Sequence, residues 1–253
     1  MSGSLVFQGE AELEVEVQRI KRWLEKQYGV RLPGVEVRYS ENTSYAFAVA
    51  DTELPFGIHP ETKKRFFRAR NSELRLHGLK EDELEGVDPS KFTVFLPGRY
   101  LSYPVRLYGA LWHELGHAAA DALNVKDKVL KEGIAIACKF AGLLLEAKEE
   151  RFTFEKAFSQ IESDIAIATE PLSFFLPYQR ALDIIKVYNL SLEFRNRNPD
   201  GLLGELEKSI QYAVKSDREM RRRELSRFEK PFVSILGGIA LVLLAISLLH
   251  SFL

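Results

Sequence analysis

The sequence predicts an α+β fold with a small strand-containing N-terminal lobe, a mainly helical second lobe and one C-terminal transmembrane helix. Three observations predict it. Segments of β character lie before residue 97, helical spacing of apolar residues dominates after Pro104, and all 35 Lys and Arg and all 36 Asp and Glu precede Pro231. We therefore divide the chain into residues 1–230, with lobes at about 1–103 and 104–230, and an apolar tail at 231–253.

The N-terminal lobe is expected to combine one helix with short strands. Residues 11–28 adopt helical spacing in their later part, and Gly29 is a natural helix stop. Residues 51–90 hold several Gly and Pro among many charges, which is typical of loop. Strands are predicted at Val35–Tyr39, Tyr45–Ala50 and Phe92–Leu96, the last ended by Pro97-Gly98.

The second lobe is expected to be helical almost throughout. Its main interruption is Asn189–Gly201, where polar and turn-forming residues gather. The predicted helices cover residues 104–123, 128–149, 153–165, 174–189 and 202–229.

The tail has the length and composition of a membrane span. Residues 232–253 would extend about 33 Å as a helix, close to the ~30 Å hydrocarbon core of a bilayer. Basic residues precede it and no Lys or Arg follows it, so the positive-inside bias places residues 1–230 in the cytoplasm. The basic residues before the tail are Arg221, Arg222, Arg223, Arg227 and Lys230. The lipid bilayer is thus a predicted partner of residues 232–253.

Composition limits the other partners. The net charge of −1 gives no electrostatic reason to expect nucleic acid binding. The single cysteine, Cys138, cannot form an internal disulfide, which fits a reducing compartment.

The chemistry of the chain is indicated by the segment His113-Glu-Leu-Gly-His117. Histidines four residues apart stand on one face of a helix, where both can bind one zinc ion, and Glu114 lies beside them to act on water. Leu111 lies roughly 160° around the helix from His113, so burial of the leucines would turn the histidines toward a cleft. Gly116 permits a close backbone approach.

A catalytic zinc site needs a third protein ligand, and Glu132 is the best candidate. After His117 the helix runs about 9 Å to Leu123, residues 124–127 can turn the chain, and Asp127 can cap the next helix. About 7.5 Å of returning helix brings Glu132 back to the height of His117. The alternative is that Glu132 is an ordinary early-helix glutamate favoured by the helix dipole.

The combination of HELGH and the downstream EGIA segment resembles the gluzincin branch of the zincin metallopeptidases, over roughly residues 105–140. The resemblance implies hydrolysis of peptide bonds with one zinc ion, held by His113, His117 and Glu132, and with Glu114 as general base. Lys131 stands where that family often has Asn, and Ile136 where thermolysin-like relatives have Asp. No GAMEN-like segment precedes the motif, which argues against the large aminopeptidases.

Further roles are assigned as expectations. Asp121, one turn beyond His117, can orient that imidazole from behind, or can face solvent near the end of its helix. Family members commonly steady the oxyanion with Tyr, His or Arg, and Tyr178 and Arg180 are the candidates here. A strand near the active site of zincins pairs with extended substrate; whether Phe92–Leu96 is that edge is left open.

Other functions compete with a peptidase. The main alternative is a non-catalytic, membrane-tethered zinc protein whose fourth ligand would be Asp121, His59 or His77. An intramembrane protease is disfavoured because the motif helix carries Arg106 and Asp121, and because Lys139 interrupts the apolar run after it. A chance motif in an interaction protein is the last alternative.

Overall fold

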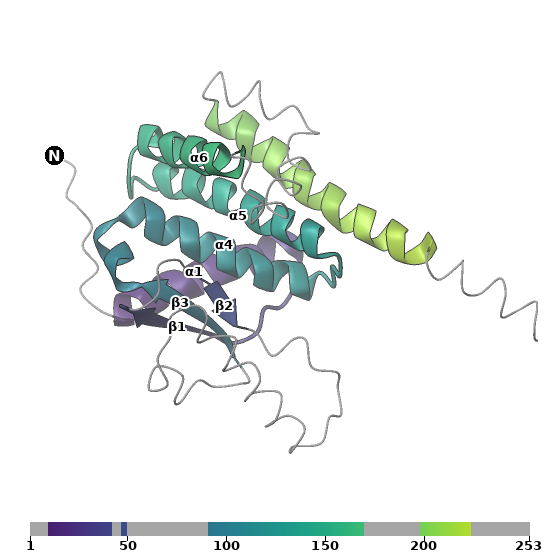
Figure 1. Ribbon diagram of the computed structural model, residues 1–253, viewed down its shortest axis with the longest axis horizontal. Coiled ribbons are helices and arrows are strands. Elements are labelled where there is room, and N and C mark those ends of the chain that lie inside the picture. The colour runs from purple at the N-terminus through teal and green to yellow at the C-terminus, as the bar shows by residue number, and fades with distance from the viewer. Residues whose placement is uncertain (1–9, 42–46, 50–90, 170–197, 224–253) are drawn as a thin grey trace, which may run out of the picture. The chain divides into compact units, whose positions relative to one another are not determined.

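The computed structural model describes residues 10–41, 47–49, 91–169 and 198–223 (Figure 1). The predicted helix 174–189, the loop 51–90 and the tail 232–253 lie outside these ranges. Two compact units are distinguished, residues 1–214 and 215–253. The candidate site and the core belong to the first unit, and the predicted lobe boundary near residue 103 stays a prediction.

The described elements are mainly helical, with one small sheet, and this confirms a mixed α+β fold. Helices α4, α5 and α6 agree with the predicted ones to within a few residues. Residues 199–223 are also helical. In chain order the elements are α1 (Glu10–Tyr28), β1 (Val35–Ser40), β2 (Phe47–Val49), β3 (Phe92–Pro97), the 3-10 helix η2 (Gly98–Ser102), α4 (Pro104–Ala122), α5 (Lys128–Lys148) and α6 (Phe154–Thr169).

The sheet has the strand order β1-β3-β2. Strand β3 runs parallel to β1, with Val35 opposite Phe92, and antiparallel to β2, with Phe47 opposite Phe95. All six residues of β3 are buried, as expected for a strand enclosed on both faces. Strand β3 is therefore the central strand of the described sheet and has a neighbour on each side. It is not the open edge to which an extended substrate could add, a role that the sequence left open for Phe92–Leu96.

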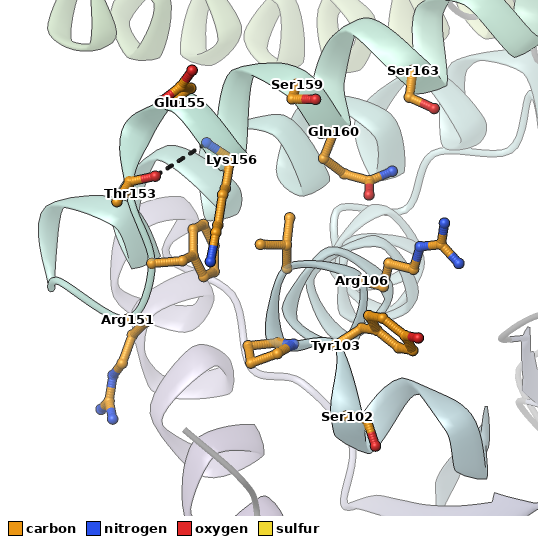
Figure 2. Close-up of a pocket in the computed structure, with 13 residues that line it drawn as sticks. Ser102, Tyr103, Arg106, Arg151, Thr153, Glu155, Lys156, Ser159, Gln160 and Ser163 are labelled. Carbon is orange, nitrogen blue, oxygen red and sulfur yellow. Dashed lines mark hydrogen bonds between the residues drawn. The ribbon is translucent and has the colours of Figure 1, made fainter. Parts of the chain in front are cut away.

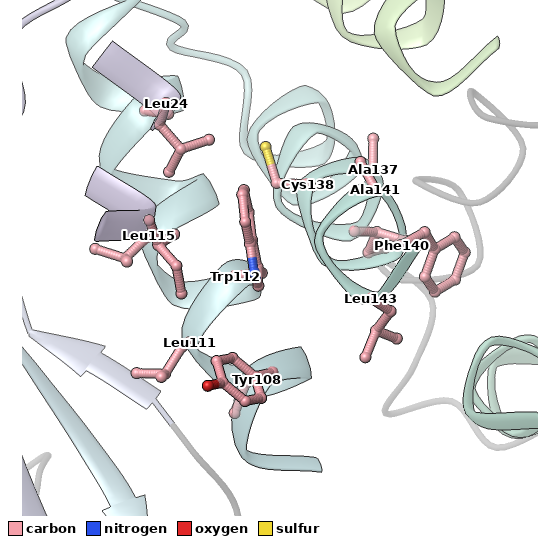
Figure 3. Close-up of a cluster of buried hydrophobic side chains, with 14 of the residues drawn as sticks. Leu24, Tyr108, Leu111, Trp112, Leu115, Ala137, Cys138, Phe140, Ala141 and Leu143 are labelled. Atoms are coloured by element: carbon pink, nitrogen blue, oxygen red, sulfur yellow. The ribbon is translucent and has the colours of Figure 1, made fainter. Parts of the chain in front are cut away.

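The core of the first unit is built around α4 and α5, which lie side by side (Figures 1 and 3). Trp112, Leu111 and Leu115 of α4 are almost completely buried, as are Cys138 and Leu143 of α5. Helix α1 packs on α4 and β1, and α6 packs on α5 and α4. The apolar stripe predicted for the motif helix therefore faces the core, and the rest of α4 is free to carry polar groups.

Glycines allow α4 and α5 to approach closely. A Cβ on Gly116 would lie 2.8 Å from Ala135 Cα and 2.9 Å from Cys138 Cβ. A Cβ on Gly142 would lie 2.0 Å from the Trp112 ring. The prediction that Gly116 permits close approach is confirmed, and the space at Gly142 is filled by an indole.

The turn between α4 and α5 fixes their relative height. Asn124 adopts a left-handed conformation with φ of 60°, which Asn tolerates better than most residues. The Asp127 side chain then accepts a hydrogen bond of 2.9 Å from the Leu130 backbone N–H, so Asp127 is the N-cap of α5, as predicted.

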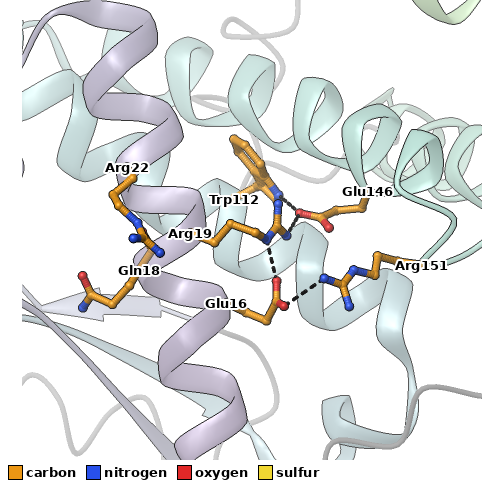
Figure 4. Close-up of polar contacts among 7 residues, drawn as sticks. All are labelled: Glu16, Gln18, Arg19, Arg22, Trp112, Glu146 and Arg151. Carbon is orange, nitrogen blue, oxygen red and sulfur yellow. Dashed lines mark hydrogen bonds and ion pairs between the residues drawn. The ribbon is translucent and has the colours of Figure 1, made fainter.

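A polar network centred on the buried Glu146 joins α1 to the α4–α5 pair (Figure 4). Glu146 is fully buried and accepts hydrogen bonds from Arg19 Nη2 at 2.5 Å and from Trp112 Nε1 at 2.9 Å. Arg19 also pairs with Glu16 at 2.7 Å, and Arg151 pairs with Glu16 at 3.1 Å. Trp112 directly precedes His113, so the network holds α4 in a fixed rotation next to the motif.

Among the described residues, no helix is long and apolar enough to cross a membrane.

Candidate metal centre

Helix α4 supplies the two histidines of the centre. The His113 and His117 rings lie edge to face, with centroids 4.8 Å apart. Their side chains are 18% and 27% exposed, whereas Leu111 and Leu115 are completely buried. One helix therefore divides its faces between core and site, as its sequence predicts.

Helix α5 brings Glu132 against the histidine pair. Its Oε1 lies 3.4 Å from His113 Nε2, and its Oε2 lies 3.4 Å from His117 Nε2. One ligand atom from each residue lies within 4.8 Å of the others, so this cluster could hold a metal ion. The returning-helix arithmetic correctly placed Glu132 at the height of the motif.

The spacing of these atoms suits zinc. Two ligand atoms that are each about 2.05 Å from a tetrahedral zinc ion lie about 3.3 Å apart. The two Nε2 to carboxylate distances of 3.4 Å, each to a different oxygen of Glu132, are close to that separation, and the three ligand atoms as a set lie within 4.8 Å of one another. The donor set of two imidazoles and one carboxylate is also a common catalytic zinc set.

Burial keeps both imidazoles in the form that binds metal. Loss of solvent lowers the pKa of His113 well below its usual value, and the nearby His117 and Lys139 lower it further. Burial lowers the pKa of His117 to about 4, although the charge of Asp121 acts in the opposite direction. Neutral imidazole is the species with a lone pair for a cation.

The carboxyl of Glu132 is perturbed in the other direction. Burial raises its pKa to about 7, and the positive charge of Lys139 opposes this increase. A carboxyl in such surroundings holds a proton near neutral pH until a cation replaces it. A metal ion bound here would have to displace that proton.

Glu114 is located next to His113 in α4 and is only 5% exposed. It takes part in contacts within the described structure. Its burial keeps bulk water away from its carboxyl group. Its role as general base stays a prediction.

Asp121 is held by a residue from the next helix. Its Oδ1 accepts a short hydrogen bond from Lys131 Nζ, which joins the end of α4 to the start of α5. Its charge reaches His117, whose pKa it raises. Lys131, where gluzincins often have Asn, therefore braces the turn that presents Glu132. A direct Asp121–His117 hydrogen bond stays a prediction.

The surroundings of the candidate ligands differ from the gluzincin pattern at one position and from the usual zinc site at another. Ile136, four residues after Glu132, is fully buried in the core. His113 Nδ1 is buried and has no hydrogen-bond partner among the residues that the structure describes. In zinc sites that nitrogen normally donates to an acceptor.

Lys139 is a neighbour of the site that the sequence motifs do not identify. It lies seven residues after Glu132, two turns along the same face of α5, and forms an ion pair of 2.7 Å with Asp164 of α6. Its charge acts on the pKa of both His113 and Glu132. In the sequence, Lys139 stands out only as a charge that interrupts an apolar run. Its seven-residue spacing from Glu132, which places both residues on one face of α5, is the signal that could have identified it.

The remaining candidates cannot be placed. Tyr178 and Arg180, predicted to stabilise an oxyanion, and His59 and His77, considered as fourth ligands, lie outside the described residues.

The chain matches no protein-family model, no curated protein and no solved structure.

Proposed function

We propose that the protein is a membrane-anchored zinc metallopeptidase with His113, His117 and Glu132 as the zinc ligands. The observation that supports this most is the convergence of their ligand atoms within 4.8 Å, with Glu132 brought by α5 against the two histidines of α4, the helix that also carries Glu114. Three protein ligands leave a fourth position for water or substrate, as in catalytic zinc sites.

The residues of the chain divide the chemistry between them. Zinc, when bound, supplies Lewis-acid activation of water and of a peptide carbonyl. Glu114 accepts the proton of the attacking water and later donates it to the leaving amine. The burial of Glu114 supports this role because proton transfer is most effective where bulk water is excluded.

The exposure of the ligands argues against a purely structural zinc site. Such sites are closed, with all four positions filled by protein. Here His113, His117 and Glu132 are each about one fifth to one quarter exposed. The α4–α5 pair is already joined by the Lys131–Asp121 ion pair and by the close contact at Gly116. A metal staple would therefore add little, and the non-catalytic alternative is the weaker one.

The membrane anchor is part of the proposal. The uncharged residues 231–253 follow the basic residues Arg221–Arg223, Arg227 and Lys230, which favours a single C-terminal span with the catalytic domain in the cytoplasm. Substrates would then be peptides or proteins that reach the cytoplasmic surface of the membrane.

The test of the proposed function is Glu114→Gln. Loss of a general acid–base group typically costs 10²–10⁴-fold in rate, so peptide hydrolysis should fall by about that factor while the zinc content is unchanged. Glu149→Gln, at an exposed position after α5, is the matched control and should keep full activity. Full activity of purified Glu114→Gln would contradict the assigned role.

A further inference from the structure

A second polar feature lies in the same compact unit as the metal centre. It is a cleft of about 920 Å³ between the start of α4 and the start of α6 (Figure 2). Tyr103 and Arg106 contribute from the α4 side, and Lys156, Gln160 and Ser163 contribute from α6. A cleft of this size accommodates several residues of an extended peptide.

Arg106, which lines the cleft from the first turn of α4, lies on the same face of that helix as the histidines. Arg106 precedes His113 by seven residues, which corresponds to about 20° of rotation and about 10.5 Å of rise. The cleft wall is also linked to the centre by side chains. Gln160 donates a hydrogen bond of 3.0 Å to Asp164. Asp164 pairs at 2.7 Å with Lys139, whose charge acts on His113.

The cleft contains a cation suited to a carboxylate ligand. Arg106 is exposed, and its guanidinium lies 5.7 Å from the centre of the Tyr103 ring. Arg151, another basic residue of the lining, is paired with Glu16. The lining also holds the acidic Glu155 and the basic Lys156, which are neighbours in sequence. A guanidinium presents parallel N–H donors that match the two oxygens of a carboxylate. Arg106 and Lys156 are the exposed basic residues of the lining, and of these two Arg106 lies on the helix of the histidines, seven residues before His113.

We propose that this cleft binds the substrate of the metal centre and that Arg106 binds a carboxylate of that peptide. The inference rests on the proposed function and deepens it by naming the substrate class. An extended strand covers about 3.4 Å per residue, so the backbone rise of about 10.5 Å between Arg106 and His113 corresponds to about three residues of extended peptide. The carboxylate can be an Asp or Glu side chain or a peptide C-terminus.

Peptide binding tests the proposal separately from catalysis. The full chain with Glu114→Gln, loaded with zinc in mild detergent, is titrated with fluorescent Ala-Ser peptides and followed by anisotropy. One peptide has a free C-terminal carboxylate, one is amidated, and one is amidated but contains a single internal Glu. We expect the two carboxylate-bearing peptides, or one of them, to bind about ten-fold more tightly than the neutral amide.

The affinities of the three peptides identify the source of the carboxylate, and variants of Arg106 test the role of that residue. Preference for the free acid alone assigns the C-terminus, and preference for the Glu peptide assigns a side chain. Arg106→Met should remove the preference, and Arg106→Lys should retain part of it. Arg22→Met, at an exposed position on α1, is the control and should change nothing.

Equal binding of all three peptides, no peptide binding at all, or a preference that survives in correctly folded Arg106→Met would overturn the proposal. Folding of each variant is checked by circular dichroism and by its zinc content. Hydrolysis by the wild-type chain without any carboxylate preference would reject this inference and leave the proposed function intact. Arg106-dependent binding without hydrolysis would reject the peptidase and leave the carboxylate site.

Discussion

At the residue scale, the candidate metal centre combines a spacing along one helix with contacts between two helices. The four-residue spacing of His113 and His117 defines a helix face, and the length of the turn defines where Glu132 returns. Both arguments need only helix geometry. The Lys131–Asp121 pair and the reach of Lys139 toward the centre depend on how two helices pack, which spacing along one chain does not specify.

Zinc binding should release a proton near neutral pH. Burial raises the pKa of Glu132 to about 7, so below that pH a proton competes with the metal. The low pKa of His117, about 4, keeps that imidazole from competing until the solution is far more acidic. Zinc affinity should therefore rise with pH up to about 7 and level off above it.

Calorimetric titration with zinc in buffers of different ionisation enthalpy measures the protons released. Glu132→Gln removes the titrating carboxyl and should bind zinc more weakly, without the pH dependence around neutrality. A wild-type affinity that stays constant as pH falls from about 7 to about 5.5 would show that no such proton is held.

At the element scale, the α4–α5 pair determines the site. The capping role of Asp127 could be predicted because an Asp just before a helix commonly accepts a hydrogen bond from a backbone N–H of the first turn. The sequence indicates a close approach at Gly116 but does not predict the distance between the helices. That distance depends on which small residue of one helix contacts which residue of the other. Gly116 meets Ala135, and Gly142 receives Trp112. The separation of Glu132 from the histidines follows from these contacts.

Gly116→Ala should separate the helices and weaken zinc binding. The new Cβ would lie 2.8 Å from backbone Cα of Ala135, so the helices must move apart, at a cost of about 1–3 kcal/mol. Chemical denaturation and zinc titration measure the two effects.

Gly204→Ala is the matched control, since its Cβ would meet nothing within 4 Å in the helical segment 199–223. It should stabilise the protein by about 0.5–1 kcal/mol and leave zinc affinity unchanged. Unaltered stability and zinc affinity in Gly116→Ala would mean that the contact does not set the site.

At the scale of the whole molecule, fold class was predictable and sheet order was not. Alternating and helical patterns identify each element by itself, and they gave the mixed fold. They do not say which strands are neighbours, and β3 lies between β1 and β2 although it follows both in sequence. The tail, by contrast, is predicted from composition alone: its lack of charge is a property of the segment and needs no partner.

The full chain should behave as an integral membrane protein. It should remain in the membrane pellet after alkaline carbonate extraction, whereas a chain ending at Lys230 should be released. Leu243→Arg, in the middle of the tail, should reduce insertion because a central charge costs about 2.5–3.5 kcal/mol. Release of the intact chain by carbonate would contradict the anchor and leave the metal centre unaffected.

The central claim is that His113, His117 and Glu132 bind one zinc ion. Metal analysis of the purified chain, together with anomalous diffraction at the zinc edge, tests it most directly. The account predicts one zinc ion per chain, with an anomalous peak bonded to Nε2 of both histidines and to the Glu132 carboxylate. A zinc-free protein under saturating zinc, or a peak at other residues, would contradict it.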